Sequence, residues 1–402
     1  MSVINTNTIS LNAQRNLASN SASLATTIQR LSSGLRINSA RDDAAGLAIS
    51  ERFSTQIRGL NVAVRNANDG ISLAQTAEGG LGEIGSNLQR IRELAVQSAN
   101  ATNSSSDRTA LNAEVNQLVS EIDRVAKQSE FNGTKLLDGS FLGQLFQVGA
   151  NAGQAIAINK TANAQANALG GATFDTLAAA AVAGGTATAA TTITGISISG
   201  GGLAAAVAID TVTVEIGDTA RVVDGKIAAA INAKIGETGL FAEASASGIS
   251  FSSVRESLDS SGAFQGFSVA TGTLGSTGAG ITLASGPAAN SASPSTNPVY
   301  LDALNISSVV GAGRALAIID KALTTVNGAR ADLGAVQNRF SSVVANLNTS
   351  SENLTASRSR IRDADYAKET AELTRTQILQ QAGTAMLAQA NQIPQNVLSL
   401  LR

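Results

Sequence analysis

The side chains that most often carry out chemistry in proteins are missing from this sequence. Its 402 residues include no histidine and no cysteine, which excludes an imidazole acid or base, a thiolate nucleophile and the usual zinc sites. Carboxylates alone or a serine–lysine pair could still catalyse a reaction, but the sequence has no GxSxG, SxxK or GxxxxGK[ST] motif. We therefore expect no catalytic residue, no cofactor, no metal site and no enzymatic activity.

The charge and hydropathy of the chain argue against nucleic-acid binding and against insertion into a membrane. The net charge is −2 and only 14% of the residues are charged, whereas nucleic-acid-binding surfaces are strongly basic. No run of about 18 apolar residues is present to span a bilayer. Residues Met1–Thr6 also lack the basic and apolar regions of a cleavable signal peptide. If the protein is exported, we expect a route that removes no such peptide.

With no reactive site to position, the strongest signals are apolar repeats typical of long helices. Aromatic residues make up only 3% of the chain, so a core must be aliphatic, which suits helices that pack along their lengths. Near the N-terminus, spacings of four and three predict a helix that is interrupted at Gly34 and at Asn38–Ser39. The large members of this first seam are Leu17, Leu24, Ile28, Leu31 and Leu35.

A second helix is predicted to begin near Asp42–Asp43, whose carboxylates suit a helix N-terminus, and to reach about Ser98. Its apolar face changes phase across Gly79 and Gly80, and each glycine costs a helix roughly 1 kcal/mol relative to alanine. The pair therefore predicts either a kink or a point where a neighbouring helix comes close. The inward residues expected on either side are Leu60, Val64, Ala67, Ile71 and Ala74, then Leu81, Ile84, Leu88, Ile91 and Ala95.

Two further helices follow from the same periodicity. One passes through Leu111–Val125 and is predicted to end before the turn signal at Asn132–Gly133, with short strands or hairpins over 135–160. The other covers Ile319–Ile361, where spacings of three and four continue without interruption. An isolated amphipathic helix of this length would expose its apolar face. It needs a helical partner, and the N-terminal third of the chain offers seams of matching length.

A last apolar repeat lies at the C-terminus. Because proline removes a helical hydrogen bond and restricts the preceding residue, Pro394 predicts a kink or a helix end near Ile393. The large members of this last seam are Leu379, Met386, Ile393, Val397 and Leu400.

Between the helical ends the composition changes to Gly, Ala, Ser and Thr, and strand-like alternation replaces helical periodicity. A short helix is expected at Ala220–Ile235, and the insert is expected to be bounded by the stretches 178–190 and 286–298. Strands are expected at Thr191–Ile198, Ile209–Ile216, Phe241–Ala246 and Ile249–Ser253.

The predicted fold class is mainly α with an α+β insert. Antiparallel terminal helices form coiled-coil inner domains, and a β-rich variable outer domain is inserted in the middle. The expected segments are an inner core helix at 1–43, a coiled-coil rod at 44–174, a surface-exposed insert at 175–300, the returning rod at 301–361 and the returning core helix at 362–402.

Several stretches near the two ends carry a specific resemblance to a known family. They are Ser2–Asn7 with Leu11–Arg15, Gln29–Ile49, Gln89–Ala99, Phe131–Gly133 and Arg360–Gln392. In these stretches the chain resembles the bacterial flagellins, over most of residues 1–140 and 315–402 and in the right order. The middle resembles the variable insert of that family only loosely, near Val212–Ser253.

The resemblance implies a subunit of the extracellular flagellar filament, a helical homopolymer used for swimming. It also implies unfolded export through the flagellar type III apparatus, with an export chaperone at the C-terminal segment. The filament cap and the hook–filament junction proteins would be further partners. Because each isolated end exposes an apolar stripe, we expect residues 1–40 and 362–402 to be disordered in the monomer and to fold on docking. Their contacts would be heterologous, which gives open helical filaments.

The resemblance also implies two segments that host receptors could read. The patch expected for vertebrate Toll-like receptor 5 consists of Gln89, Arg90, Arg92, Glu93, Leu94, Leu111 and Glu114. The segment expected for the plant flagellin receptor includes Gln29, Arg36, Ile37, Asn38, Asp42, Asp43, Gly46 and Leu47. Both sets are equally compatible with a purely structural role in helix packing and assembly.

Two alternatives remain open at this point. A hook–filament junction protein shares the terminal helices of the flagellins. A secreted adhesin with a coiled-coil stalk would use the insert to bind a host ligand, and an exposed aromatic cluster or a basic patch within 175–300 would favour it.

Overall fold

The computed structural model describes residues 6–159, 161–180, 182–245, 248–259, 261–270, 272–275, 280–283 and 298–399, without the side chains of 177–180 and 393–399. The chain forms two compact units. The first unit comprises 1–69, 146–156 and 340–402, and the second comprises 70–145 and 157–339. None of the described helices combines the length and the apolar character that a bilayer crossing requires.

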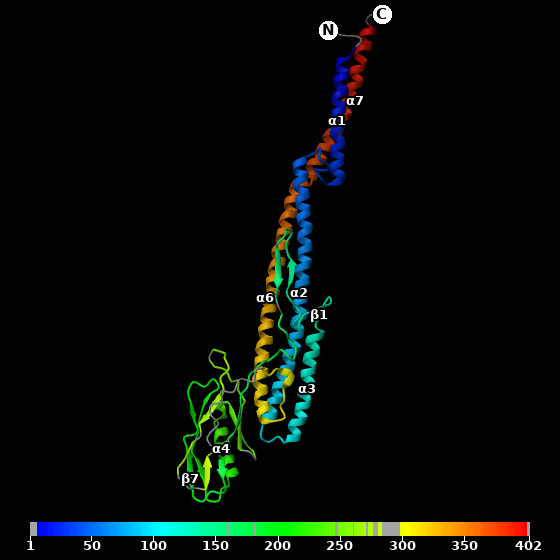
Figure 1. Cartoon of the computed structure of the whole chain (residues 1–402). Helices are drawn as coiled ribbons and strands as arrows, with labels where there is room; N and C mark the ends of the chain where they lie inside the picture. Colours follow the sequence, from blue (N-terminus) through cyan, green and yellow to red (C-terminus); the bar gives the residue numbers. More distant parts are fainter. Residues whose placement is uncertain are drawn as a thin grey trace. The chain divides into compact units, whose positions relative to one another are not determined.

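In the first unit the two ends of the chain form a helix pair. Helices α1 (Thr8–Ser33) and α7 (Tyr366–Ser399) lie side by side next to the two termini (Figure 1). The Asn7 side chain caps α1 by accepting a hydrogen bond from the Ser10 N–H at 3.0 Å. Gly34 ends α1 in the left-handed conformation, with φ +70°, and donates its N–H to Arg30. The helix end expected at Gly34 is confirmed.

The other core of the first unit lies between the longest helices, α2 (Ala44–Ala99) and α6 (Val309–Arg362). Here Leu60 and Ala63 of α2 are buried together with Leu347 of α6. Strands β3 (Gln144–Gln147) and β4 (Ala155–Ile158) pair beside them. Phe146 and Phe340 meet edge to face, with ring centroids 5.7 Å apart.

In the second unit α2 packs with α3 (Ser105–Gln128) and with the first part of α6. The seam predicted for this part of α2 is confirmed, because its five residues are completely buried: Leu81, Ile84, Leu88, Ile91 and Ala95. Helix α2 runs unbroken through Gly79 and Gly80. A Cβ on Gly80 would lie 2.7 Å from the Ser129 hydroxyl and 2.8 Å from Leu137 Cδ1. A neighbour does come close to this glycine, but the residues that approach, Ser129 and Leu137, lie after the end of α3 and not in another helix as expected.

A short hairpin follows α3. It joins β1 (Glu130–Phe131) to β2 (Thr134–Lys135) through Asn132 and Gly133, which have φ values of 48° and 78°. Two consecutive positive φ values are the requirement of a tight hairpin turn, so the turn expected at Asn-Gly is confirmed.

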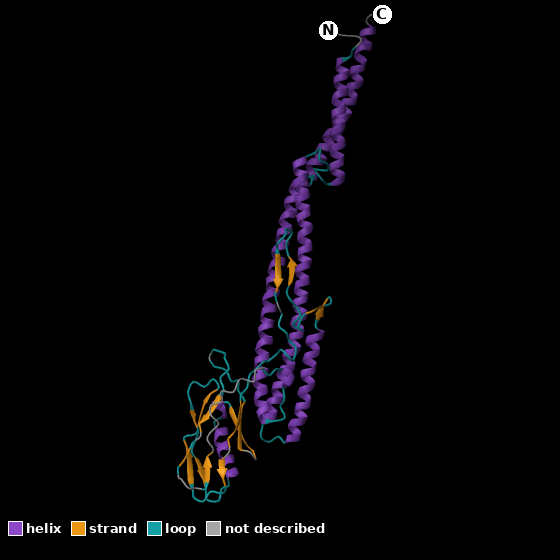
Figure 2. Cartoon of the chain, in the orientation of Figure 1, coloured by secondary structure: helices purple, strands orange, loops and turns teal. Residues whose placement is uncertain are grey.

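The insert also belongs to the second unit and is built from small antiparallel sheets around α4 (Ala220–Ala233), which α5 (Ile235–Thr238) follows (Figure 2). Its three-stranded sheets have the orders β10-β7-β14, β11-β12-β5 and β13-β8-β9, and β15 pairs with β6. The strands are β5 (Thr176–Ala180), β6 (Val182–Gly184), β7 (Thr191–Thr194), β8 (Ser197–Gly200), β9 (Val207–Ala208), β10 (Val212–Val214), β11 (Leu240–Ser245), β12 (Gly248–Ser253), β13 (Phe267–Ala270), β14 (Thr273–Leu274) and β15 (Ile281–Leu283). A short 3-10 helix, η1 (Leu301–Ala303), leads back toward α6.

Two expectations about element boundaries are wrong, and a third concerns residues that the structure does not describe. The stretch 178–190 is no linker, because β5 pairs with β12 and β6 with β15 inside it. The helix end expected near Ile393 is wrong, because α7 continues to Ser399. Proline's fixed φ is compatible with a helix and costs it one hydrogen bond, and the alternative expectation of a kink there stays a prediction. Of the expected boundary at 286–298, residues 286–297 lie outside the described residues.

Candidate assembly surface

The contact between α1 and α7 is partly polar, whereas helix pairs are usually apolar. Positions that face the partner recur at spacings of three and four, and Ser10, Thr27 and Thr376 are among them, with exposed fractions of 6%, 4% and 0%. Leu17, Leu24 and Leu31 occupy alternate inward positions and are half-buried. The seam predicted from the sequence includes these leucines but not the buried polar residues Ser10 and Thr27.

The predicted seam residues therefore divide between two faces. Ile28 is 51% exposed, Leu379 45% and Met386 69%, so these side chains point away from the α1–α7 contact. Leu35 lies beyond the end of α1 and forms an isolated bridge with Asp363. The side chains of Ile393 and Val397, and all of Leu400, lie outside the described residues.

The loop that joins α1 to α2 is held by hydrogen bonds. The Asp42 carboxylate accepts from the N–H of Asn38 at 3.1 Å and of Ser39 at 2.9 Å. The bonds from Ser39, followed by that from Asn38, hold the pKa of Asp42 below its ordinary value. Ile37 is buried, and its N–H and that of Arg36 both donate to the Arg362 carbonyl at the end of α6.

The residues that we expect the plant flagellin receptor to recognise do not form one exposed surface. Ile37 and Gly46 are buried, while Gln29, Arg36, Asp42 and Asp43 are exposed and Asn38 and Leu47 half-buried. Asp43 accepts from the Gly46 N–H at 2.8 Å at the start of α2. A Cβ on Gly46 would lie 2.7 Å from Ile37 Cδ1, so glycine is required for the loop to close over the helix.

The residues that we expect Toll-like receptor 5 to recognise form an ionic surface in the second unit. Arg90 of α2 pairs with Glu114 of α3 at 2.9 Å and with Glu93 at 3.0 Å. Arg92 pairs with Asp320 of α6 at 2.8 Å, and this hydrogen bond raises the pKa of Arg92. Gln89 is also exposed and Leu111 half-buried, whereas Leu94 is only 1% exposed and belongs to the core.

Arg314 of α6 anchors the insert. Its guanidinium donates to the main-chain carbonyls of Ser253 at 2.8 Å and Asp175 at 3.2 Å, and it lies 5.2 Å from the ring centroid of Phe174. Burial lowers the pKa of Arg314, and the charge of Asp175 opposes this shift. A second link joins Lys321 to Glu256 at 2.6 Å. Nothing in the sequence pattern distinguished Arg314 from other arginines.

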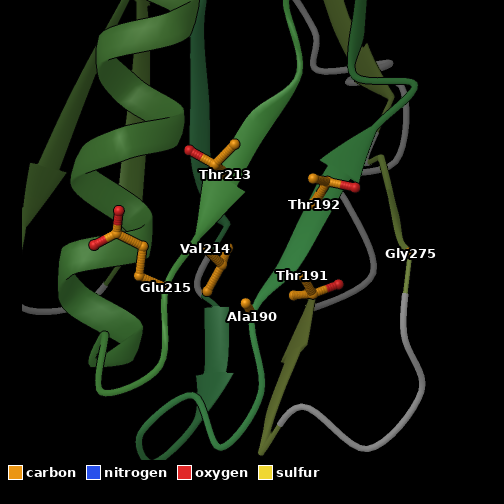
Figure 3. A pocket seen from close by; sticks show the side chains of 7 residues that line it. All are labelled: Ala190, Thr191, Thr192, Thr213, Val214, Glu215 and Gly275. Atoms are coloured by element: carbon orange, nitrogen blue, oxygen red, sulfur yellow. The ribbon is translucent and has the colours of Figure 1, made fainter.

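The insert also has a shallow depression of about 440 Å³ where β7 and β10 meet (Figure 3). Thr191 and Val214 are buried while Thr192, Thr213 and Glu215 are exposed, as the alternation of a strand requires. The labelled side chains consequently point apart and do not converge on a common centre (Figure 3). The described residues also contain no cluster of acidic, histidine or cysteine side chains that could hold a metal ion.

The two terminal helices pair with each other and carry exposed apolar side chains, and a β-rich domain is inserted between them in the sequence. These features define a class of coiled-coil subunits that self-assemble. Two family models match the chain: the bacterial flagellin N-terminal helical region over residues 4–141 and the C-terminal helical region over 316–401. The chain belongs to the bacterial flagellin family. It is a structural subunit of the extracellular flagellar filament and not an enzyme.

Known flagellins match nearly the whole chain. Flagellin A of Vibrio cholerae is 43% identical and B-type flagellin of Pseudomonas aeruginosa 40%, each over 99% of both chains. The solved structure of FliC from Burkholderia pseudomallei is 29% identical and covers 67% of this chain and 99% of that chain, with a TM-score of 0.37. The two family models and the identity to these two flagellins support a filament subunit over a hook–filament junction protein. The described phenylalanines of the insert are buried or half-buried, so they give the adhesin alternative no exposed aromatic cluster.

Proposed function

We propose that the filament used for swimming is built through the terminal segments 1–43 and 362–402, with the 44–174 and 301–361 segments as a surrounding rod and 175–300 facing solvent. The observation that carries this proposal is the exposure of large apolar side chains on the helix pair. Ile9 is 58% exposed, Ile378 60% and Met386 69%. Exposed apolar surface of this kind marks an interaction site.

The same observation supports folding of the ends on docking. Residues 1–40 and 362–402 have few apolar partners of their own, so ordering them in an isolated monomer is unfavourable. Neighbouring subunits cover the outward side chains and supply the missing burial. The contacts are heterologous and generate an open helix.

The proposal is tested by seeded growth. Purified full-length chain is added to sonicated filament fragments, and the lengths of the fibres are followed by electron microscopy. We expect long helical fibres that extend from the seeds, and no comparable growth from the chain without seeds over the same time. A chain that yields only monomers or closed rings would contradict the proposal.

We further propose that the C-terminal segment binds an export chaperone before assembly and that the filament cap and junction proteins contact the same terminal helices afterwards. The exposed apolar side chains of α7, Ile378, Leu379 and Met386, support this, because such a face needs protection while the chain is unassembled.

We propose that Arg90, Arg92, Glu93, Leu111 and Glu114, with Gln89, form the surface that vertebrate Toll-like receptor 5 recognises on the monomer. Leu94 supports this surface from the core, since it is only 1% exposed. A plant receptor would read the 29–47 segment only after its release from the fold, because Ile37 and Gly46 are buried.

The vertebrate receptor surface can be tested with Arg90→Ala. We expect this variant to need roughly tenfold more monomer for half-maximal receptor activation, as for an arginine at the centre of an interface. Arg124→Ala is the matched control, because Arg124 makes a comparable exposed ion pair with Glu121 on α3. Equal potency of Arg90→Ala and the parent chain, or an equal loss in the control, would refute this surface.

A further inference from the structure

Four hydrogen bonds between described residues cross the α1–α7 contact, and we call them the polar ladder. Asn7 Nδ2 donates to the Ala390 carbonyl at 2.8 Å, and Ser10 Oγ donates to Asn391 Oδ1 at 2.9 Å. Further along, Asn20 Nδ2 donates to the Thr376 carbonyl at 2.8 Å. Arg30 donates to Glu369 at 3.3 Å and forms an ion pair with it. The ladder therefore follows the contact from the start of α1 to its last turn.

The ladder lies inside the helix pair, together with the half-buried Leu17, Leu24 and Leu31 of α1. Ser10, Glu369 and Thr376 are at most 9% exposed. In the described parts of the two helices, other large hydrophobic side chains are exposed: Ile9, Leu11, Ile28, Tyr366, Ile378, Leu379 and Met386, none of them less than 45% exposed. The pair therefore differs from an ordinary amphipathic pair, in which the apolar faces meet, because polar and apolar positions alternate inside it and large hydrophobic side chains remain outside.

Hydrogen bonds of this kind, which are partly buried, add little net stability, because the same groups bond to water when the helices are apart. They discriminate between registers, since sliding one helix along the other separates each donor from its acceptor and leaves a buried group such as the Ser10 hydroxyl unpaired. A single buried asparagine acts in the same way in coiled coils, where it selects one register at a cost in stability. The polar seam therefore suits the choice of register better than the supply of binding energy.

A steric contact selects the same register. Leu17 lies against Gly383, where an added Cβ would be 3.2 Å from Leu17 Cδ1. One helical turn further along α7 the corresponding residue is Leu387, which has no such room. A shift of α7 by one turn would thus bring two leucines together and break the ladder at the same time.

We propose that the polar ladder, together with the Leu17–Gly383 contact, sets the register of α1 on α7, and that further copies of this chain bind the apolar outer face and provide the energy of assembly. The inference rests on the proposed function and adds the residues that make the assembly specific. Register matters here because it decides which outward side chains of the two helices stand next to each other. A pair in the wrong register presents a different surface to every neighbour.

The absence of cysteine makes a direct test possible. Leu17→Cys with Gly383→Cys reports the native register by forming a disulfide under mild oxidation. Leu17→Cys with Leu387→Cys reports a shift of one turn. Each reporter is placed in the parent chain and in a ladder-free chain with Asn7→Asp, which keeps the cap of α1 but removes the donor, Ser10→Ala, Asn20→Leu, Arg30→Leu and Glu369→Leu. Cross-linking is read on non-reducing gels of seeded filaments.

In the parent chain we expect the native cross-link to exceed the shifted one at least tenfold. In the ladder-free chain we expect the ratio to fall below threefold and the fibres to lose their uniform helical shape in electron micrographs. Asn20→Ala alone should lower the ratio to an intermediate value, and it guards against a ladder-free chain that fails to fold. An unchanged ratio in both ladder variants would overturn the role of the ladder.

The role of the apolar outer face is tested separately with the double variant Ile378→Gln, Met386→Gln. We expect it to keep the parent's cross-link ratio while the protein concentration needed for growth rises at least tenfold. Growth at the parent's concentration would overturn the role of the outer face. If the parent chain itself forms no filaments, the proposed function fails. Normal growth of the parent chain together with an unchanged cross-link ratio in both ladder variants rejects the ladder alone.

Discussion

A chain that lacks residues 375–402 is expected to form no filaments at any accessible concentration while its second unit remains folded. The deletion removes most of α7, including the Thr376 carbonyl that accepts from Asn20 and the exposed side chains of Ile378 and Met386. The core of the second unit is untouched, because it lies within residues 70–145 and 157–339. Deletion of residues 1–30 should have the same effect, since it removes the other half of the pair.

The measurement combines seeded growth, followed by electron microscopy, with circular dichroism and thermal unfolding of the truncated chains. We expect retained helical signal, a cooperative unfolding transition and no growth from seeds. A chain with residues 174–297 replaced by a short glycine–serine linker is the control. Ala172 and Val299 form reciprocal main-chain hydrogen bonds of 3.0 and 2.8 Å, so a short linker can join them, and this chain should still polymerise. If either terminal truncation formed fibres, the proposal that these helices are the assembly surface would be contradicted.

Leu88→Ala is expected to destabilise the second unit by about 2–5 kcal/mol, the usual cost of removing a buried leucine side chain and leaving a cavity. Leu88 is completely buried on α2, one helical turn from Ile84 and Ile91, which are also completely buried. The other members of this seam are aliphatic and completely buried: Leu81, Ile84, Ile91 and Ala95. A cavity at this point therefore removes a large share of the local apolar contact.

The effect is measured as the change in unfolding free energy from urea titrations followed by circular dichroism. Val96→Ala on the same helix is the matched control, because Val96 is 51% exposed and surface changes of this kind usually stay within about 0.5 kcal/mol. A loss below about 1 kcal/mol for Leu88→Ala, or equal losses in the two variants, would mean that this seam is not the stabilising core.

The parts of the fold that the sequence predicted well share one property: a long repeat of large apolar residues on one face. Helices α2 and α6 were predicted because Leu81–Ala95 and Ile319–Ile361 keep one spacing over many turns. Strands β11 and β12 were predicted from their alternation, and their paired register runs from Leu240 opposite Ser253 to Ser245 opposite Gly248. In each case burial alone fixes the pattern.

The parts that were missed depend on partners that periodicity does not record. The inward face of α1 includes Ser10, Asn20 and Thr27, and only the positions of their partners on α7 show that these residues are a seam. Strand β6 has small residues of low strand propensity and forms because β15 pairs with it. Arg314 was missed for a similar reason, since its acceptors are main-chain carbonyls of residues far away in the sequence.

The way Arg314 holds the insert bears on how freely this part of the molecule can diversify. Every residue has a main-chain carbonyl oxygen, whatever its side chain. The two carbonyls that Arg314 binds would therefore be present with any amino acid at positions 175 and 253. Two side chains do matter for this attachment: the ring of Phe174, 5.2 Å from the guanidinium, and the carboxylate of Asp175, whose charge favours the charged form of Arg314 and which accepts from the Phe267 N–H at 2.8 Å. Most substitutions on the outer surface of the insert therefore leave its attachment intact, and a lineage under attack by antibodies could change that surface without rebuilding the helix that carries it.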